Sequence, residues 1–320
     1  MADLPTVLIT NAMHPGGEAV LAPHARLVVA PDAGAETLRR LARDADGIIV
    51  RAKLPDDIVD HAPRLRGMVR HGVGLDFIPV EAATRRGIAV ANLPGSNTQT
   101  VAEYFFSALF HLRRPLGRLD TRFRADGWGP ARAMADDAFE IAATTVGIIG
   151  VGAIGGRIAQ IARNGFGMTV LGASRHKGQA RPGIEEVTLE ELFRRSDAIA
   201  VTCAFTEETR GLVSAARVGM MKRDAVLVNM SRGPVVETVA LIEALHRGAI
   251  SGAAIDVYDA QPLSPDSPLF ACPRLLMTPH VAGLTATSLR QMSVGAAEEM
   301  LRILRGERPL NLVNPEHLAA

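Results

Sequence analysis

The chain has 320 residues, of which 48% are hydrophobic and 22% charged, enough apolar material for about two folded domains. Its 35 basic and 34 acidic residues nearly cancel, which argues against binding to nucleic acid through phosphate neutralisation. The first residues lack a signal-peptide pattern, and no apolar run approaches the roughly 18 residues of a membrane helix. Two cysteines, Cys203 and Cys272, allow at most one disulfide and no paired-cysteine metal motif. We therefore expect a soluble, cytoplasmic protein with no metal, nucleic-acid or membrane partner.

Short apolar runs rich in β-branched residues alternate with stretches of helical spacing along most of the chain. The first series of runs covers residues 6–10, 27–30, 47–50, 67–70 and 88–90, and the second covers residues 145–149, 168–171, 198–201, 225–228, 252–255 and 275–277. Strands that alternate with helices form βαβ units, so the pattern predicts an α/β protein with two parallel-sheet domains, Rossmann-like or flavodoxin-like. The second domain is expected to be inserted into the first.

The segment between the two series is longer than a simple domain linker. Residues 98–119 have helical character, whereas residues 122–138, which include Trp128, are polar and predicted to be irregular. A long connection without clear periodicity is more often functional or an interface arm than idle. A final helix is predicted over residues 286–305, with apolar side chains on one face.

A glycine-rich turn follows the first strand of the second series. Its G-x-G-x-x-G pattern directly follows the strand at 145–149 and opens a helical stretch at 154–163, which leads into the next strand. In this βαβ context the pattern predicts binding of a dinucleotide pyrophosphate at the start of the helix. The expected cofactor-binding residues of the turn are Gly150, Gly152, Ala153, Ile154 and Gly155.

The end of the next strand bears on the choice of cofactor. NAD enzymes usually carry Asp or Glu there to accept bonds from the adenosine ribose. Here Ser174 stands nineteen residues after Gly155, and Arg175, His176 and Lys177 follow it. A serine with neighbouring cations favours the 2′-phosphate, so we predict NADPH as the preferred cofactor with NAD possible. The alternative is a solvated basic turn.

Three further segments place chemically active side chains directly after predicted strands. Arg232 lies in residues 229–234, Asp256 follows the strand at 252–255, and His280 lies in the sequence Thr-Pro-His-Val-Ala-Gly that ends at Gly283. Ligands of open α/β sheets bind at the carboxyl ends of the strands. An arginine, a carboxylate and a histidine at that edge make a plausible site for hydride transfer.

These segments, in this order, resemble the D-isomer-specific 2-hydroxyacid dehydrogenase family, in its glyoxylate/hydroxypyruvate reductase-like branch. The resemblance extends over nearly the whole chain and rests on residues 72–76, 92–95, 101–103, 150–155, 208–211, 229–234, 256 and 278–280. It implies a homodimer of two-domain subunits with a nicotinamide cofactor. Residues 1–98 and 283–320 would form the substrate domain and residues 99–282 the cofactor domain. The helix from residue 98 and the segment at 122–138 would embrace a second subunit.

The resemblance also implies roles for individual residues. His280 would give a proton to a 2-keto acid or take one from a 2-hydroxy acid, a task suited to an imidazole with a pKa of about 6.5. Arg232 would bind and polarise the substrate, and the backbone N–H groups of Val73 and Gly74 would hold its carboxylate. Asp256 would orient the nicotinamide carboxamide. The other residues expected at the cofactor are Thr209, Met230, Ser231 and Gly283.

One residue departs from the family pattern. The family usually places a glutamate beside the histidine, whereas this chain has Gln261 before Pro262. Glutamine can orient the imidazole of His280 but cannot stabilise the imidazolium with a full charge. Formate dehydrogenases of the same superfamily also pair Gln with His, which makes formate oxidation an alternative. A dinucleotide-dependent corepressor on the same fold is another. The sequence does not specify which 2-keto acid is bound.

Overall fold

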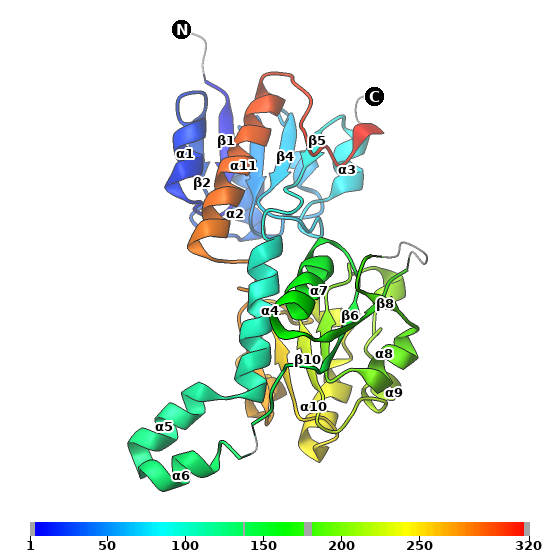
Figure 1. The fold of residues 1–320 in the computed structure, drawn as a ribbon. Helices are drawn as coiled ribbons and strands as arrows, with labels where there is room; N and C mark the ends of the chain where they lie inside the picture. The colour runs from blue at the N-terminus through cyan, green and yellow to red at the C-terminus, as the bar shows by residue number, and fades with distance from the viewer. Residues whose placement is uncertain (1–3, 137, 176–180, 317–320) are drawn as a thin grey trace. The chain divides into compact units, whose positions relative to one another are not determined.

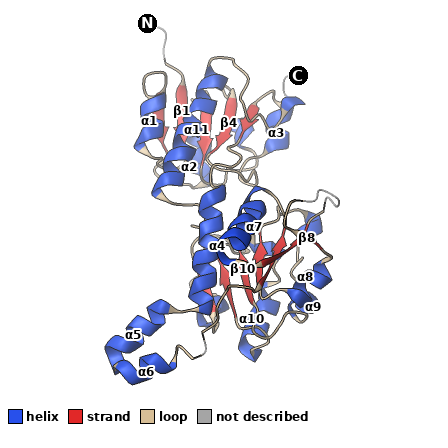
Figure 2. Ribbon diagram, in the orientation of Figure 1, coloured by secondary structure: helices blue, strands red, loops and turns tan. Residues whose placement is uncertain are grey.

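The computed structural model describes residues 4–136, 138–175 and 181–316. The chain divides into two compact units, which we describe separately (Figure 1). Unit 1 combines Met1–Asn97 with Leu284–Ala320, and unit 2 is Thr98–Gly283. Helices and strands alternate in both units (Figure 2). Among the described residues, no helix is long and apolar enough to cross a membrane.

Unit 1 is built on a parallel sheet with the strand order β2-β1-β3-β4-β5. Its strands are β1 Thr6–Ile9, β2 Arg26–Val29, β3 Gly47–Val50, β4 Gly67–Arg70 and β5 Ala89–Ala91. Strands β1 and β3 are buried along their whole length, as strands covered on both faces must be. This strand order is that of a flavodoxin-like sheet.

Helices cover both faces of the unit 1 sheet. They are α1 Pro15–Leu21, α2 Ala35–Ala42, η1 Ile58–His61, α3 Val80–Arg85 and α11 Ala286–Leu304. One apolar cluster joins the sheet to α1 and α11, and another joins its other face to α2, η1 and α3. Helix α11 approaches the sheet closely at two glycines. A Cβ atom on Gly47 would lie 2.3 Å from the sulfur of Met300, and one on Gly67 would lie 2.7 Å from the Ile303 side chain.

Unit 2 contains a larger parallel sheet with the order β12-β11-β10-β9-β6-β7-β8. Its strands are β6 Thr145–Ile149, β7 Thr169–Ala173, β8 Glu185–Glu186, β9 Ala198–Val201, β10 Val226–Asn229, β11 Gly252–Ile255 and β12 Leu275–Met277. The order contains the Rossmann arrangement, in which the first strand of the unit, β6, lies inside the sheet. The two sheets confirm the predicted α/β class.

The helices of unit 2 cover both faces of its sheet, except for one pair that stands away from it. They are α4 Thr98–Arg113, α5 Leu116–Asp126, α6 Trp128–Ala133, α7 Ala153–Phe166, α8 Leu189–Arg195, η2 Glu207–Thr209, α9 Ala215–Val218, η3 Gly233–Val235, α10 Thr238–Arg247 and η4 Pro268–Ala271. Helices α4 and α7 pack on one face, and α8, α9 and α10 on the other.

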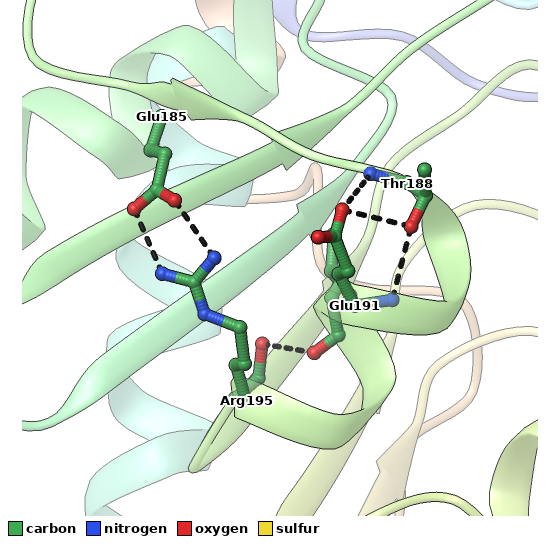
Figure 3. A network of polar contacts seen from close by, with 6 residues as sticks. Glu185, Thr188, Glu191 and Arg195 are labelled. Carbon is green, nitrogen blue, oxygen red and sulfur yellow. Dashed lines mark hydrogen bonds and ion pairs between the residues drawn. The ribbon is translucent and has the colours of Figure 1, made fainter.

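The edge strand β8 is fixed to α8 by charged side chains (Figure 3). Arg195 in the last turn of α8 donates to both carboxylate oxygens of Glu185, at 2.7 and 2.9 Å. At the other end of the helix, Thr188 accepts from the Glu191 N–H while Glu191 accepts from the Thr188 N–H, which is a capping box. These contacts hold β8 and α8 together at the edge of the sheet.

The segment after α4 differs from the sequence-based prediction. The expected helix over 98–119 ends earlier, at Arg113, because Pro115 precedes α5 and removes a backbone donor. The prediction that residues 122–138 are irregular is wrong for residues 122–126 and 128–133: α5 and α6 form a helical hairpin, which stands away from the sheet of unit 2 in Figure 1. No residue of α5 is buried in the single chain, so its sequence lacks the regular spacing of apolar residues that predicts a helix.

Candidate active site

The residues predicted to act together in unit 2 lie at one edge of its sheet. All neighbouring strands are parallel, so their carboxyl ends meet at that edge. The predicted residues follow the strands in turn: Gly150 after β6, Ser174 and Arg175 after β7, Met230, Ser231 and Arg232 after β10, Asp256 after β11, and His280 after β12. Strand β6 lies between β7 and β9, so the chain reverses its direction across the sheet there. Such a switch point is where open α/β sheets bind ligands.

The glycine turn has the backbone geometry that a dinucleotide needs. Gly150 has a φ of +94°, and a Cβ atom there would lie 2.5 Å from the Cα of Cys203. A Cβ on Gly155 would lie 2.5 Å from the Gly150 carbonyl oxygen, so this glycine lets α7 pack close to the turn. A Cβ on Gly152, in contrast, would meet open space. Gly152 caps α7, which begins with Ala153 and Ile154, so a pyrophosphate can approach the helix N-terminus.

Two arginines lie around the glycine turn, of which the sequence analysis found one. Nη1 of Arg175 lies 3.1 Å from Oε2 of Glu208, and both side chains are exposed. Nη1 of Arg181 donates to the carbonyl oxygen of Gly152 at 2.8 Å. Arg181 was missed because it lies 29 residues from Gly152 and no motif connects the two. The predicted residues His176 and Lys177 lie outside the described part of the chain.

The turn that carries Arg232 is held by a buried asparagine. Oδ1 of Asn229 accepts from the Ser231 N–H at 3.1 Å, and Nδ2 of Asn229 donates to the Arg232 carbonyl at 3.1 Å. The Ser231 hydroxyl donates to the Cys203 carbonyl. A Cβ on Gly233 would lie 2.0 Å from the Tyr258 carbonyl carbon, so only glycine lets this turn lie against the segment after β11.

Asp256 organises the loop on which His280 stands. Its carboxylate is 1% exposed and accepts from the Thr278 hydroxyl at 2.6 Å and from the N–H groups of Val281 and Ala282 at 2.8 Å each. The His280 N–H donates to the Asp256 carbonyl oxygen at 2.9 Å. A buried carboxylate is stabilised by several such donors. This positioning role was not foreseen, and the predicted contact with a nicotinamide carboxamide stays a prediction.

His280 and Gln261 are brought together although nineteen residues separate them. Nδ1 of His280 lies 2.8 Å from Oε1 of Gln261. His280 has a φ of +56°, an uncommon value for a residue other than glycine. Such a backbone conformation is kept only where the surrounding contacts hold it in place. The pair borders a pocket of about 520 Å³ that is lined by Tyr258, Gln261, Pro262, Leu263, Phe270, Met277, Thr278, Pro279 and His280.

Two tyrosines that the sequence analysis did not single out support the same loop. The hydroxyl of Tyr104, on α4, lies 2.6 Å from the Thr278 hydroxyl, which itself donates to Asp256. Burial, opposed in part by this bond, raises the pKa of Tyr104 to about 12, so the phenol stays protonated. The Tyr258 hydroxyl donates to the Thr278 carbonyl at 2.9 Å. Only the three-dimensional packing of α4 on the sheet could have revealed the first contact.

The remaining predicted residues take different places in the structure. Val73 and Gly74 belong to unit 1, where Asn92 donates to the Val73 carbonyl at 2.8 Å and Arg70 donates to the Gly74 carbonyl at 3.0 Å. Thr209 ends η2, and its hydroxyl donates to the Ala204 carbonyl at 2.9 Å. Met230 is buried and Gly283 is the last residue of unit 2. Within residues 4–136, 138–175 and 181–316, no group of three His, Cys, Asp or Glu side chains could hold a metal ion.

A glycine turn at the switch point of a parallel sheet, with an arginine and a histidine at the same edge, defines a dinucleotide-dependent dehydrogenase. Residues 106–282 match the family model for the NAD binding domain of D-isomer specific 2-hydroxyacid dehydrogenases. The chain is also 36% identical to the glyoxylate reductase of Aeropyrum pernix, over 88% of this chain and 86% of that protein. The chain therefore belongs to the D-isomer specific 2-hydroxyacid dehydrogenase family, and it is an NAD(P)-dependent enzyme.

Solved structures that are similar to this chain include complexes with different cofactors. One is the NADPH-dependent glyoxylate/hydroxypyruvate reductase of Sinorhizobium meliloti in complex with NADP and malonate, with a TM-score of 0.85, 28% identity, and coverage of 98% of this chain and 97% of that one. Another is the NAD-dependent formate dehydrogenase of Staphylococcus aureus in complex with NAD, with a TM-score of 0.84, 27% identity, and coverage of 97% and 99%. Both extend over nearly all of the present chain.

Proposed function

We propose that the enzyme reduces a small 2-keto acid of the glyoxylate or hydroxypyruvate type to the D-2-hydroxy acid, with NADPH preferred over NADH. The observation that carries the proposal is the His280–Gln261 pair, held by Asp256 at the sheet edge that also bears the glycine turn. The curated relatives that support this substrate class include the glyoxylate reductase at 36% identity.

His280 is proposed as the proton donor. The Gln261 amide oxygen accepts from Nδ1, so a proton stays on that nitrogen and Nε2 is left to exchange the proton with the substrate oxygen. A bound nicotinamide cofactor supplies the hydride when the 2-keto acid is reduced. The neutral Nδ1–H tautomer that remains after the transfer is the one that Gln261 stabilises.

Arg232 is proposed to bind the substrate carboxylate and to polarise its carbonyl. A guanidinium offers several donors in a fixed plane, which suits a 2-keto acid with adjacent oxygens. Asn229 and Gly233 fix the turn on which it stands. In the same proposal, the N–H groups of Val73 and Gly74 contribute to carboxylate binding from unit 1, the substrate domain. Unit 2 binds the cofactor, with contacts from Thr209, Met230, Ser231, Asp256 and Gly283.

The preference for NADPH is supported by the end of β7. Ser174 stands where a carboxylate would repel a 2′-phosphate, and Arg175 adds a cation beside it. Arg181 brings a second cation to Gly152. We propose that Arg175 contacts the 2′-phosphate and that Arg181 adds positive potential on the same side of the glycine turn.

A homodimer is proposed from the α5–α6 hairpin. Leu116, Phe123 and Trp128 are 66%, 48% and 72% exposed, and the rings of Phe123 and Trp128 pack edge to face with their centroids 6.0 Å apart. Exposed apolar side chains gathered on a projecting element mark an interaction surface. We propose that the hairpin packs on a second copy of this chain. Free Cys203 and Cys272 suit the reducing cytoplasm, where we place the enzyme.

Formate oxidation is kept as a second candidate because Gln261 contacts His280. Formate gives up a hydride without releasing a proton to a base, so a neutral Gln–His pair is sufficient. The experiment that tests both candidates is a panel of 2-keto acids assayed with NADPH and NADH, together with formate assayed with NADP⁺ and NAD⁺. We expect turnover of a small 2-keto acid with the higher kcat/KM for NADPH. Oxidation of formate without reduction of any 2-keto acid would overturn the main proposal.

A further inference from the structure

An ion pair connects the two loops on either side of the glycine turn. Arg175 follows β7 and Glu208 lies in η2, which follows β9; these strands flank β6 on opposite sides. Nη1 of Arg175 lies 3.1 Å from Oε2 of Glu208. The ion pair therefore joins the loops that border the switch point, where the adenosine half of a dinucleotide is expected to bind.

The charges of this pair can be separated at little cost. The side chain of Arg175 is 65% exposed and that of Glu208 is 72% exposed. Exposed ion pairs of this kind contribute little to stability. A phosphate monoester carries a charge of about −1.5 to −2 at neutral pH, so it attracts an arginine more strongly than a single carboxylate does. To bind a 2′-phosphate, the guanidinium of Arg175 would have to leave the carboxylate of Glu208.

We propose that Glu208 competes with the adenosine 2′-phosphate for Arg175 and thereby limits how strongly the enzyme prefers NADPH. This inference rests on the proposed binding of the 2′-phosphate by Arg175. The end of β7 has Ser174 where a carboxylate is usual in NAD enzymes. Glu208 supplies a carboxylate from the neighbouring loop instead. With NADPH bound, Arg175 exchanges Glu208 for the phosphate; with NADH bound, the ion pair persists.

The adjacent glutamate provides a matched control. Glu207 is exposed like Glu208 and begins the same short helix, but its carboxylate binds Arg210 at 2.7 and 2.9 Å. Glu207→Gln removes the same charge one residue away and leaves the Arg175–Glu208 pair intact. A general electrostatic effect would appear in both variants, whereas competition for Arg175 would appear only in Glu208→Gln.

The test measures binding of 2′,5′-ADP and 5′-AMP by calorimetry in the full-length wild type and in variants. Glu208→Gln is expected to bind 2′,5′-ADP about two- to fivefold more tightly, the range of an exposed ion pair, with 5′-AMP unchanged. Glu207→Gln should change neither affinity. In an Arg175→Met background, Glu208→Gln should give no gain. The ratio of NADPH to NADH affinity should rise in Glu208→Gln alone.

The possible failures are distinguishable. If Arg175→Met weakens 2′,5′-ADP binding but Glu208→Gln does not strengthen it, the competition is refuted while NADPH preference stands. An equal gain in Glu207→Gln and Glu208→Gln refutes it in favour of a general charge effect. If Arg175→Met leaves 2′,5′-ADP binding unchanged and the wild type prefers NADH, both the competition and the proposed cofactor preference are wrong.

Discussion

The amide oxygen of Gln261 lies 2.8 Å from Nδ1 of His280. A neutral amide orients the ring as a carboxylate would, but it adds no negative charge beside the imidazolium. The reaction that His280 is proposed to serve needs a protonated ring when a 2-keto acid is reduced. The pH range of reduction therefore depends on the residue at position 261.

Gln261→Glu is expected to extend 2-keto acid reduction to higher pH. The introduced carboxylate favours the imidazolium, so the loss of activity with rising pH should occur on the order of one pH unit higher than in the wild type. Single-turnover reduction measured against pH, with NADPH saturating, gives this displacement directly. Gln291→Glu, on the exposed side of α11, is the charge control. Superimposable profiles, or a displacement to lower pH, would show that Gln261 does not act on His280 as proposed.

Arg232→Ala should lower kcat/KM for the 2-keto acid by roughly 10²- to 10³-fold, the typical effect of removing one donor to a developing charge. The dissociation constant of NADPH should stay nearly unchanged, because the guanidinium is proposed to contact substrate only. Arg247→Ala, in an exposed i,i+4 pair with Glu243 on α10, is the control for loss of an arginine. Loss of NADPH binding with turnover retained at saturation would contradict the assignment.

The double variant Ser174→Asp with Arg175→Ala should shift cofactor preference towards NADH. The aspartate can accept hydrogen bonds from the ribose hydroxyls of NADH, and it repels the 2′-phosphate of NADPH. Removal of Arg175 also takes away the positive charge that attracts this phosphate. A tenfold change in preference requires only about 1.4 kcal/mol, which one phosphate contact can supply. The measurement is kcat/KM for each cofactor at a fixed 2-keto acid concentration. A wild type that already prefers NADH would mean that the residues after β7 are misinterpreted.

The α5–α6 hairpin predicts a dimer that depends on its aromatic residues. Sedimentation should give about twice the 34.0 kDa of the chain at micromolar concentration. Phe123→Ser with Trp128→Ser removes the edge-to-face pair and should shift the equilibrium towards monomer. The thermal unfolding of the chain itself should change little, because no residue of α5 is buried. Val239→Ser, at an exposed apolar site on α10, is the control. A stable wild-type monomer would refute the dimer.

His71 in unit 1 should make folding sensitive to acid. Burial, together with the positive charges of Arg51 and Arg70, lowers the pKa of His71 to about 4, and its Nε2 lies 2.8 Å from the Ser293 hydroxyl. Between this pKa and the value of about 6.5 in an unfolded chain, only the unfolded state binds the proton, so stability falls as the pH falls through that range. The free energy of unfolding that is lost at the acid end of this range is at most roughly 3 kcal/mol.

The measurement for His71 is the denaturation midpoint at several pH values from 7 to 4. His71→Gln is expected to lower stability at pH 7 through the altered buried contact but to flatten the dependence on pH. His24→Gln, at an exposed position, should keep the wild-type slope. A His71→Gln slope equal to that of the wild type would show that another group is responsible.

The sequence predicted the fold class and the sheet edge at which the candidate residues lie because both depend on local patterns. Buried parallel strands are nearly continuous apolar runs, and a residue that directly follows such a run, like Arg232 after β10, must lie at the carboxyl edge of the sheet. The same argument placed Asp256 and His280 at that edge. It could not give the three bonds by which Asp256 holds the His280 loop, because two of the donors are backbone N–H groups without a sequence signature and the third, the Thr278 hydroxyl, is placed by the turn of the loop.

Other features could not be predicted because they depend on tertiary contacts or lie on an exposed element. The α5–α6 hairpin has no buried face in α5, so its helices lack the apolar period that identified the others. Arg181 reaches Gly152 only because residues 181–183 lie beside α7, and Tyr104 reaches Thr278 only because α4 packs on the sheet. The end of α4 before Pro115, in contrast, is predictable from the sequence, because a proline disfavours continuation of a helix.

The groups proposed for proton transfer and substrate polarisation, His280, Gln261 and Arg232, all stand on the sheet that also carries the glycine turn. In the proposal, unit 1 contributes the backbone donors at Val73 and Gly74. The proposed proton donor, its orienting amide and the polarising arginine thus all belong to one of the two units. Substitutions in the loops of unit 1 can therefore accumulate without breaking any of the bonds that hold His280 and Asp256 in place.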